Sequence, residues 1–308
     1  MDGLKSTGSE YCGIICIDKP QGFTSFDVIA KLRGILKIKR LGHAGTLDPM
    51  ATGVLPVFVG KATKACDILP DHDKTYEAGF KLGETTDTQD ITGTVTNKVE
   101  SFNVSANDIN NVLEKFRGNI MQVPPMYSAV SVGGKRLYDL ARKGIEVERE
   151  ARPITVYNLE LVSYDEKSAC GVMRISCSKG TYIRALINDI GQALSCGGIM
   201  TTLIRTSACG FGLDKCTTFD ELQSVNTEEN YLDRFIYPIE NVFRACPEIC
   251  LSGVQERMYR NGVKLDSERV RIPEKAERYR VYGSDEFIGT AYIDNEKNEL
   301  RAEKNFFA

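Results

Sequence analysis

The stretch LGHAGTLDPMATGVL, which runs from Leu41 to Leu55, holds one of the chain's two histidines, one aspartate, one proline and three glycines. An aspartate before a proline is most often a turn residue, because Asp bonds its own backbone and Pro fixes the next φ. Here the three glycines also permit other backbone segments to approach closely. A carboxylate held on so tight a turn can act as a nucleophile or a base, so Asp48 is the first candidate for catalysis.

A basic segment precedes this turn. KLRGILKIKR, residues 31–40, contains lysines and arginines and no acid. Alone, such a run is typical of a solvated helix face. Its position beside Asp48 favours contact with phosphate instead. The formal net charge of -3 does not argue against this, because residues 217–240 alone carry -5 and leave about +2 for the remainder.

Length and composition exclude several classes of protein. The chain has 308 residues, which suggests about two domains, and its hydrophobic fraction of 42% and charged fraction of 26% are those of a soluble globular protein. Its apolar runs are of strand length and too short to span a bilayer. The segment MDGLKSTGSEY lacks a basic region followed by an apolar one, so we expect no signal peptide and a cytoplasmic location.

Ten cysteines are spread along the chain without a C-x-x-C pair, and only two histidines accompany them. This spacing does not fit a zinc site, so we expect reduced cysteines that act as small hydrophobic residues. A glycine-rich nucleotide fingerprint and a P-loop are also absent from the sequence. We therefore expect no metal and no cofactor.

The hydrophobic pattern interleaves strands and helices without a regular βαβ repeat, and it favours an α+β fold: a mixed, largely antiparallel central sheet with flanking helices. The acidic segment 217–240 is interpreted as a helical boundary. Beyond residue 246, a helix near 254–261 and a hairpin over 278–294 predict a small β-rich unit. Expected strands cover residues 13–20, 54–60, 74–83, 152–164, 169–180 and 197–210, expected helices cover 24–37, 66–69, 107–118 and 181–194, and residues 83–93 are expected to form a loop.

A second motif, SKGTYIRALINDIG at residues 178–191, places Arg184 in the first turn of a predicted helix. A cation is not electrostatically favoured there, which suggests a specific carboxylate partner. A hydrogen-bonded pair with Asp48 would keep that carboxylate ionised and oriented. The sequence spacing leaves open a surface arginine without a partner.

Two tyrosines could also serve the site. Tyr76 and Tyr182 are either half-buried core aromatics or platforms on which an extruded base stacks. Glycoside hydrolysis is disfavoured, because it needs a second carboxylate that the Asp48 motif does not supply.

Five segments, taken in order, resemble the bacterial tRNA pseudouridine-55 synthase family of the TruB type. The resemblance extends over residues 13–212, and the tail from 246 is more weakly similar to a PUA-like RNA-binding domain. The resemblance to this family implies an enzyme that isomerises uridine to pseudouridine in the T-loop of tRNA without metal or organic cofactor. The segments are IDKPQGFTSFDV, GHAGTLDPMATGVLPVFVGKATK, KTYEAGFKLGETTDTQDITG, VPPMYSAV with GKRLYDLAR, and CSKGTYIRALINDIG.

The resemblance also implies a role for each matching residue. Asp48 would be the catalytic aspartate, Arg184 its partner, and Tyr76 the residue that stacks on the flipped base and moves a proton. The implied substrate-binding residues are Lys19, which supports the site, His43, which contacts RNA beside the displaced base, and Tyr182 and Leu203, which line the base pocket.

The implied organisation is a catalytic domain over residues 1–245, with an RNA-gripping insertion at about 124–152, and a PUA-like domain over 246–308. The expected partner is tRNA, bound through its T-arm to a monomer, with no membrane and no obligate protein partner. Two alternatives stay open. One is a related synthase with another RNA target, although guide-directed relatives usually carry longer basic extensions. The other is a tRNA-folding chaperone whose catalysis is secondary.

Overall fold

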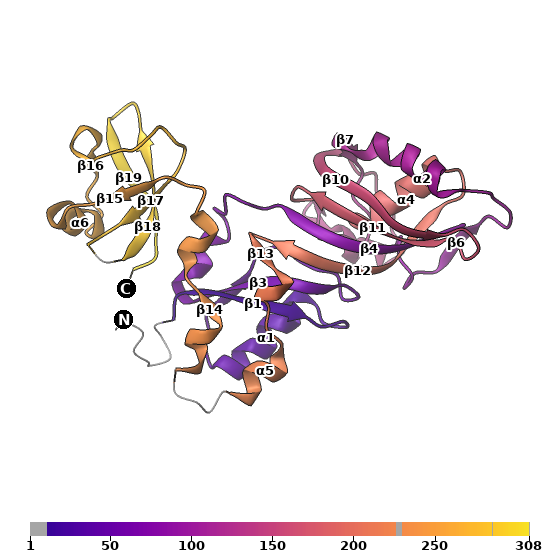
Figure 1. Cartoon of the computed structure of the whole chain (residues 1–308), viewed down its shortest axis with the longest axis horizontal. Coiled ribbons are helices and arrows are strands. Elements are labelled where there is room, and N and C mark those ends of the chain that lie inside the picture. The colour runs from indigo at the N-terminus through magenta and orange to yellow at the C-terminus, as the bar shows by residue number, and fades with distance from the viewer. Residues whose placement is uncertain (1–10, 226–229, 285, 308) are drawn as a thin grey trace.

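The computed structural model describes residues 11–225, 230–284 and 286–307. Within them lies a ten-stranded sheet with the path β14-β1-β3-β12-β4-β11-β10-β7, to which β2 adds beside β3 and β13 beside β12 (Figure 1). Its pairings are antiparallel except for that of β12 with β3, which confirms the expected mixed, largely antiparallel sheet. The strands are β1 (Gly13–Lys19), β2 (Leu41–His43), β3 (Thr52–Val59), β4 (Lys74–Leu82), β7 (Gly118–Gln122), β10 (Arg152–Asp165), β11 (Cys170–Cys177), β12 (Gly198–Ala208), β13 (Phe211–Gly212) and β14 (Ile236–Tyr237).

Helices cover different parts of this sheet. Helix α1 (Ser25–Leu36) begins after Thr24, whose hydroxyl accepts from the backbone N–H of Asp27 while the Asp27 carboxylate accepts from the backbone N–H of Thr24. Its apolar side chains pack against β1 and β3. Farther along the sheet, α4 (Ile183–Ala193) and α2 (Ala106–Leu113) pack on β4, β10 and β11 (Figure 1).

Three expectations about local structure are wrong. The short helix lies at η1 (Gly60–Ala65), before residues 66–69. The expected loop at 83–93 begins with β5 (Glu84–Thr86), which pairs with β6 (Val95–Lys98). The helix expected to end at Gly118 ends earlier and is followed by η2 (Glu114–Phe116). Gly118, with a φ of 79°, instead turns the chain into β7.

The acidic segment 217–240 is part of the large sheet unit and not a helical boundary. Helix α5 (Phe219–Ser224) buries Phe219 and Leu222 in the core cluster that contains α1, and β14 pairs with β1 at the edge of the sheet. Apolar residues between the acids make these contacts, so local charge did not decide the packing. Residues 226–229 lie outside the described residues. The 3-10 helices nearby are η3 (Leu213–Lys215), η4 (Tyr231–Arg234) and η5 (Ile239–Phe243).

The segment 124–152 leaves the sheet between β7 and β10. It contains a two-stranded pair, β8 (Ser131–Val132) with β9 (Lys135–Arg136), and the short helix α3 (Leu137–Ala141). Leu137 is its anchor, because this side chain is fully buried.

The last part of the chain forms a separate five-stranded sheet with its own apolar core, in the order β15-β17-β18-β19-β16 (Figure 1). Phe287 and Phe306 pack against Phe243 of the large unit, with ring centroids 6.2 and 6.0 Å from that of Phe243. Lys61 and Lys64 donate to the carbonyls of Phe307 and Asn305. The elements are β15 (Glu248–Cys250), α6 (Gly253–Arg260), β16 (Leu265–Asp266), η6 (Ser267–Arg269), β17 (Tyr279–Tyr282), β18 (Phe287–Asp294) and β19 (Glu299–Asn305).

Candidate active site

Arg184 and Asp48 meet where the first turn of α4 faces the turn before β3. The Nε of Arg184 donates to Oδ2 of Asp48 over 2.8 Å. The arginine side chain is 6% exposed and the aspartate side chain 38% exposed, so the cation is buried behind a carboxylate that solvent can reach. Nη1 and Nη2 of Arg184 donate to the carbonyls of Thr88 and Tyr127, each over 2.9 Å. The arginine therefore joins three loops at one point.

A second carboxylate, which the sequence reasoning missed, lies on the same arginine. Oδ2 of Asp90 is 3.8 Å from Nε of Arg184, and the Asp90 side chain is 7% exposed. Its Oδ1 accepts from the hydroxyls of Thr88 and Thr92 and from the backbone N–H of Thr92. The run TDTQDIT carries the signal, because an aspartate with a threonine two residues to either side is typical of side-chain-capped turns. Arg184 thus lies between two aspartates.

The buried Lys19 side chain contacts the turn that carries Asp48. Its side chain is fully buried, and Nζ donates to the carbonyls of Pro20, Phe23 and Pro49 at 3.0, 2.6 and 3.3 Å. Burial lowers the pKa of this ammonium from 10.5 to about 8, although the nearby Asp48 raises it. The Pro49 contact fixes the residue that follows Asp48 in the chain.

Tyr76 and Leu203 lie on the neighbouring strands β4 and β12. Both belong to the core cluster that reaches Leu47, one residue before Asp48, and each is 6% exposed. Burial raises the pKa of the Tyr76 hydroxyl to about 12, and the cation of Arg205 opposes the rise. The phenol therefore stays protonated at neutral pH and is able to donate a proton.

Tyr182 lies just before α4, at its N-cap position. Its backbone N–H donates to Oε1 of Gln122, and its carbonyl accepts from Nε2 of the same side chain. No sequence pattern pointed to Gln122, whose side chain connects the start of α4 to the end of β7. The contact thus holds the backbone at the N-terminus of the helix that carries Arg184.

His43 is the last residue of β2, five positions before Asp48 in the chain. Its ring meets Phe26 edge-on, with centroids 5.4 Å apart and an interplanar angle of 81°, and Phe26 is 68% exposed. Burial and the nearby Arg205 lower the pKa of His43. The imidazole is therefore neutral at physiological pH. Its buried Nδ1 forms no hydrogen bond within the described residues.

The structure also bears on metals and on the cysteines. Among the described residues, no group of three His, Cys, Asp or Glu side chains is placed to hold a metal ion. All ten cysteines are free thiols, of which five are buried. Over the same residues, we find no helix that could cross a membrane.

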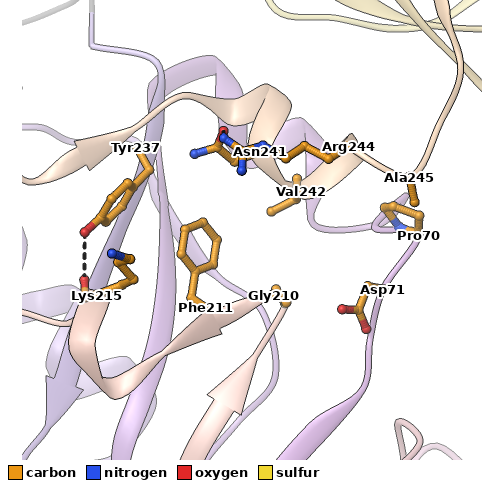
Figure 2. Close-up of a pocket in the computed structure, with 11 residues that line it drawn as sticks. Pro70, Asp71, Gly210, Phe211, Lys215, Tyr237, Asn241, Val242, Arg244 and Ala245 are labelled. Atoms are coloured by element: carbon orange, nitrogen blue, oxygen red, sulfur yellow. Dashed lines mark hydrogen bonds between the residues drawn. The ribbon is translucent and has the colours of Figure 1, made fainter.

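A cavity of about 510 Å³ lies elsewhere, between the end of β12 and the segment leading to the last sheet (Figure 2). Phe211 and Val242 line it with the charged Lys215 and Arg244. The Tyr237 hydroxyl donates to the Lys215 carbonyl at its wall (Figure 2). None of the seven predicted site residues contributes to its lining, so it is distinct from the Asp48 site.

Comparisons with known proteins cover most of the chain. The family model of the TruB family pseudouridylate synthase N-terminal domain matches residues 33–183. The model of the tRNA pseudouridylate synthase B C-terminal domain matches residues 184–244. Together these two matches extend over more than half of the sequence.

Curated relatives are similar over nearly their whole length. A tRNA pseudouridine synthase B of Clostridium tetani is 41% identical over 278 residues, which cover 90% of this chain and 94% of that protein. A tRNA pseudouridine synthase B of Pasteurella multocida is 38% identical over 305 residues, 97% of each chain. Among solved structures, a chain of a Cbf5-Nop10-Gar1 complex is 27% identical with a TM-score of 0.74, covering 96% of this chain and 85% of that one.

Proposed function

Because the chain belongs to the TruB family of pseudouridylate synthases and is a tRNA pseudouridine synthase, an isomerase, we propose that its target is the uridine at position 55 in the T-loop of tRNA and that Asp48 is the catalytic carboxylate. The observation that carries the assignment is the exposed Asp48 carboxylate backed by the buried Arg184. The named relatives are synthases, so a chaperone with secondary catalysis is not favoured.

The reaction needs a carboxylate in this setting. The C1′–N1 bond of the uridine breaks, the base turns over, and a C1′–C5 bond forms, after which C5 loses its proton and N1 carries one. A carboxylate can act on the nucleotide as a nucleophile or a base while closure of the site keeps water away. Arg184 donates to Oδ2 of Asp48, so Oδ1 is available to act on the nucleotide.

The target uridine must first leave its stack, at a cost of about a few kcal/mol. Tyr76 supports this step because it shares a core cluster with Leu47, the residue before Asp48, and its ring can stack on the extruded base. Leu203 of the same cluster and Tyr182, the N-cap residue of α4, would contact the base as well. The protonated Tyr76 hydroxyl can then move a proton to or from the base. His43, neutral and edge-on to the exposed Phe26, faces the RNA beside the displaced base.

Recognition of tRNA uses the insertion at 124–152. The guanidinium groups of Arg136 and Arg142 lie 5.9 and 5.4 Å from the centroid of the Tyr138 ring. Both arginines are exposed, as are Lys135 and Lys143. Such a basic and aromatic surface suits a folded RNA loop read by shape and phosphate contact.

In this proposal residues 1–245 form the catalytic domain and residues 246–308 form a PUA-like domain. The protein acts as a monomer on the T-arm of tRNA in the cytoplasm.

The test uses tRNA transcripts labelled with tritium at C5 of uridine, because formation of the C1′–C5 bond releases that tritium. We expect the purified protein to release tritium from a wild-type transcript and none above background from one that has cytidine at position 55. Equal release from both transcripts would reject position 55. No release from either would reject the activity.

A further inference from the structure

Arg205 occupies the centre of the large sheet, beside the site but outside the set of residues that the sequence suggested. It lies on β12, directly opposite Tyr76 of β4 on one side and Gly53 of β3 on the other. Its side chain is fully buried, and it is the largest such side chain among the described residues. A buried guanidinium is costly unless its donors are satisfied. The partners of Arg205 therefore indicate why it is there.

These partners are backbone carbonyls of the stretch that contains Asp48. Nε donates to the Val54 carbonyl at 2.7 Å, Nη2 to that of Gly45 at 3.2 Å, and Nη1 to that of Thr46 at 3.5 Å. Arg205 forms no salt bridge with any residue that the structure describes. Its planar fork thus holds the chain on both sides of Asp48 at once, which the single ammonium of a lysine cannot reproduce.

Two glycines of the same stretch make room for this arrangement. A Cβ on Gly53 would lie 2.3 Å from the backbone carbonyl oxygen of Arg205. A Cβ on Gly45 would lie 2.9 Å from Cε of Lys74 and at an ordinary contact distance, 3.5 Å, from Nη1 of Arg205. Both glycines have a positive φ, 99° and 80°. Gly53 therefore lets the backbones of β3 and β12 approach each other at Arg205, and Gly45 lets the turn pass close to Lys74.

Arg205 also acts on Tyr76, the residue directly opposite it on β4. Burial raises the pKa of the Tyr76 hydroxyl, and the positive charge of Arg205 opposes that rise. One cation thus holds the turn that carries Asp48 and lies close enough to Tyr76 to influence its hydroxyl.

We propose that Arg205 is a positioning residue for the isomerisation: its fork holds the Asp48 turn in a fixed position relative to Tyr76, its neighbour on the adjacent strand. The inference rests on the proposed function of that site. It assigns to Arg205 no contact with the RNA, because the side chain has no exposed surface.

The experiment compares wild type with Arg205→Lys, which keeps the charge, and Arg205→Gln, which keeps a donor. Single-turnover tritium release is measured with enzyme in excess, each variant at the same interval below its own melting temperature, and tRNA affinity is measured by filter binding. We expect Kd values within about threefold of wild type and rates about 100-fold lower, as for a misplacement of about 1 Å. Arg205→Lys should cost less in a Tyr76→Phe background, because residues that act together are not additive.

Arg117→Lys is the matched control. Arg117 also donates from Nε and Nη2 to a backbone carbonyl, that of Leu159, but away from Asp48. Its rate should equal that of wild type. Three outcomes would each overturn the positioning role. They are a wild-type rate for Arg205→Lys, additive rate losses when Arg205→Lys is combined with Tyr76→Phe, and failure of both Arg205 variants to fold. A wild-type protein without tritium release would instead refute the proposed function.

Discussion

The Nε of Arg184 lies 2.8 Å from Oδ2 of Asp48, although 136 positions separate the two residues in the chain. The contact is asymmetric, because the arginine is buried while more than a third of the aspartate side chain is exposed. Further donors of Arg184 hold the carbonyls of Thr88 and Tyr127. The buried guanidinium thus orients the carboxylate, and the exposed part of the carboxylate stays accessible, as a nucleophile or proton acceptor must be.

Asp48→Asn should bind tRNA with a Kd within about threefold of wild type and lose at least about 10³-fold in single-turnover rate. The amide keeps the shape of the side chain but can be neither a nucleophile nor a base. Filter binding and tritium release measure the two quantities. Turnover near the wild-type rate would remove Asp48 from the chemistry.

Asp90→Asn should lower the single-turnover rate by about 10- to 100-fold, the equivalent of ~1.5–3 kcal/mol for a hydrogen bond to a charged group. The change removes one of the two anions beside Arg184 while keeping the side-chain shape held by Thr88 and Thr92. Asp87→Asn is the control from the same loop, because that exposed carboxylate accepts from the Thr94 backbone. Equal rates for the two variants would contradict a role for Asp90.

Tyr76→Phe should leave tRNA affinity unchanged and slow the chemical step by about 10²- to 10⁴-fold, since the ring remains for stacking and the proton donor is lost. Tyr164→Phe is the matched control, because that ring stacks on Phe80 at 6.0 Å in another part of the sheet. The comparison is made by single-turnover tritium release. A Tyr76→Phe variant as fast as Tyr164→Phe would show that the hydroxyl moves no proton.

Lys19 should make the free energy of unfolding depend on pH in the alkaline range. Its pKa is about 8 in the folded chain against 10.5 without burial. Between these values the unfolded chain binds more protons than the folded one, so the contribution of Lys19 to the unfolding free energy rises with pH, by up to ~1.4 kcal/mol per unit. Urea unfolding followed by circular dichroism at pH 7.5 and 9.5 measures this for wild type and Lys19→Met.

The advantage of wild type over Lys19→Met should therefore be larger at pH 9.5 than at pH 7.5. Other titrating groups are common to both proteins and cancel in the difference. A constant or shrinking difference would mean that Lys19 keeps an ordinary pKa.

Two helical glycines should respond oppositely to alanine. A Cβ on Gly34 of α1 meets nothing within 4 Å, whereas one on Gly191 of α4 would lie 2.3 Å from the backbone of Gly197. Gly34→Ala should stabilise by ~0.5–1 kcal/mol through helix propensity. Gly191→Ala should destabilise by ~1–3 kcal/mol through overpacking and should also slow turnover, because α4 carries Arg184. Thermal melts and tritium release test both, and equal melting temperatures would refute the contrast.

Sequence patterns that involve only neighbouring residues predicted several local features correctly. The capping box at Thr24 and the placement of Arg184 in the first turn of α4 are both confirmed, because each depends on neighbours within about one helical turn. The acidic segment 217–240 was misread for the same reason. Its charges are local, but its place in the fold follows from Phe219 and Leu222, which pack against a helix near the other end of the chain.

By itself, the sequence determined the family, the mixed sheet and the residues from which a catalytic site could be built, since alternation, caps and motif spacing are written along the chain. The tertiary structure alone decided which residues share that site. Asp90 and Arg205 carry no distinctive local pattern for catalysis, yet strand pairing and the β5–β6 loop bring them to Arg184 and to the Asp48 turn. The physical reason is that ion pairs and hydrogen bonds depend on distance in space, and sheet registry sets that distance independently of separation in sequence.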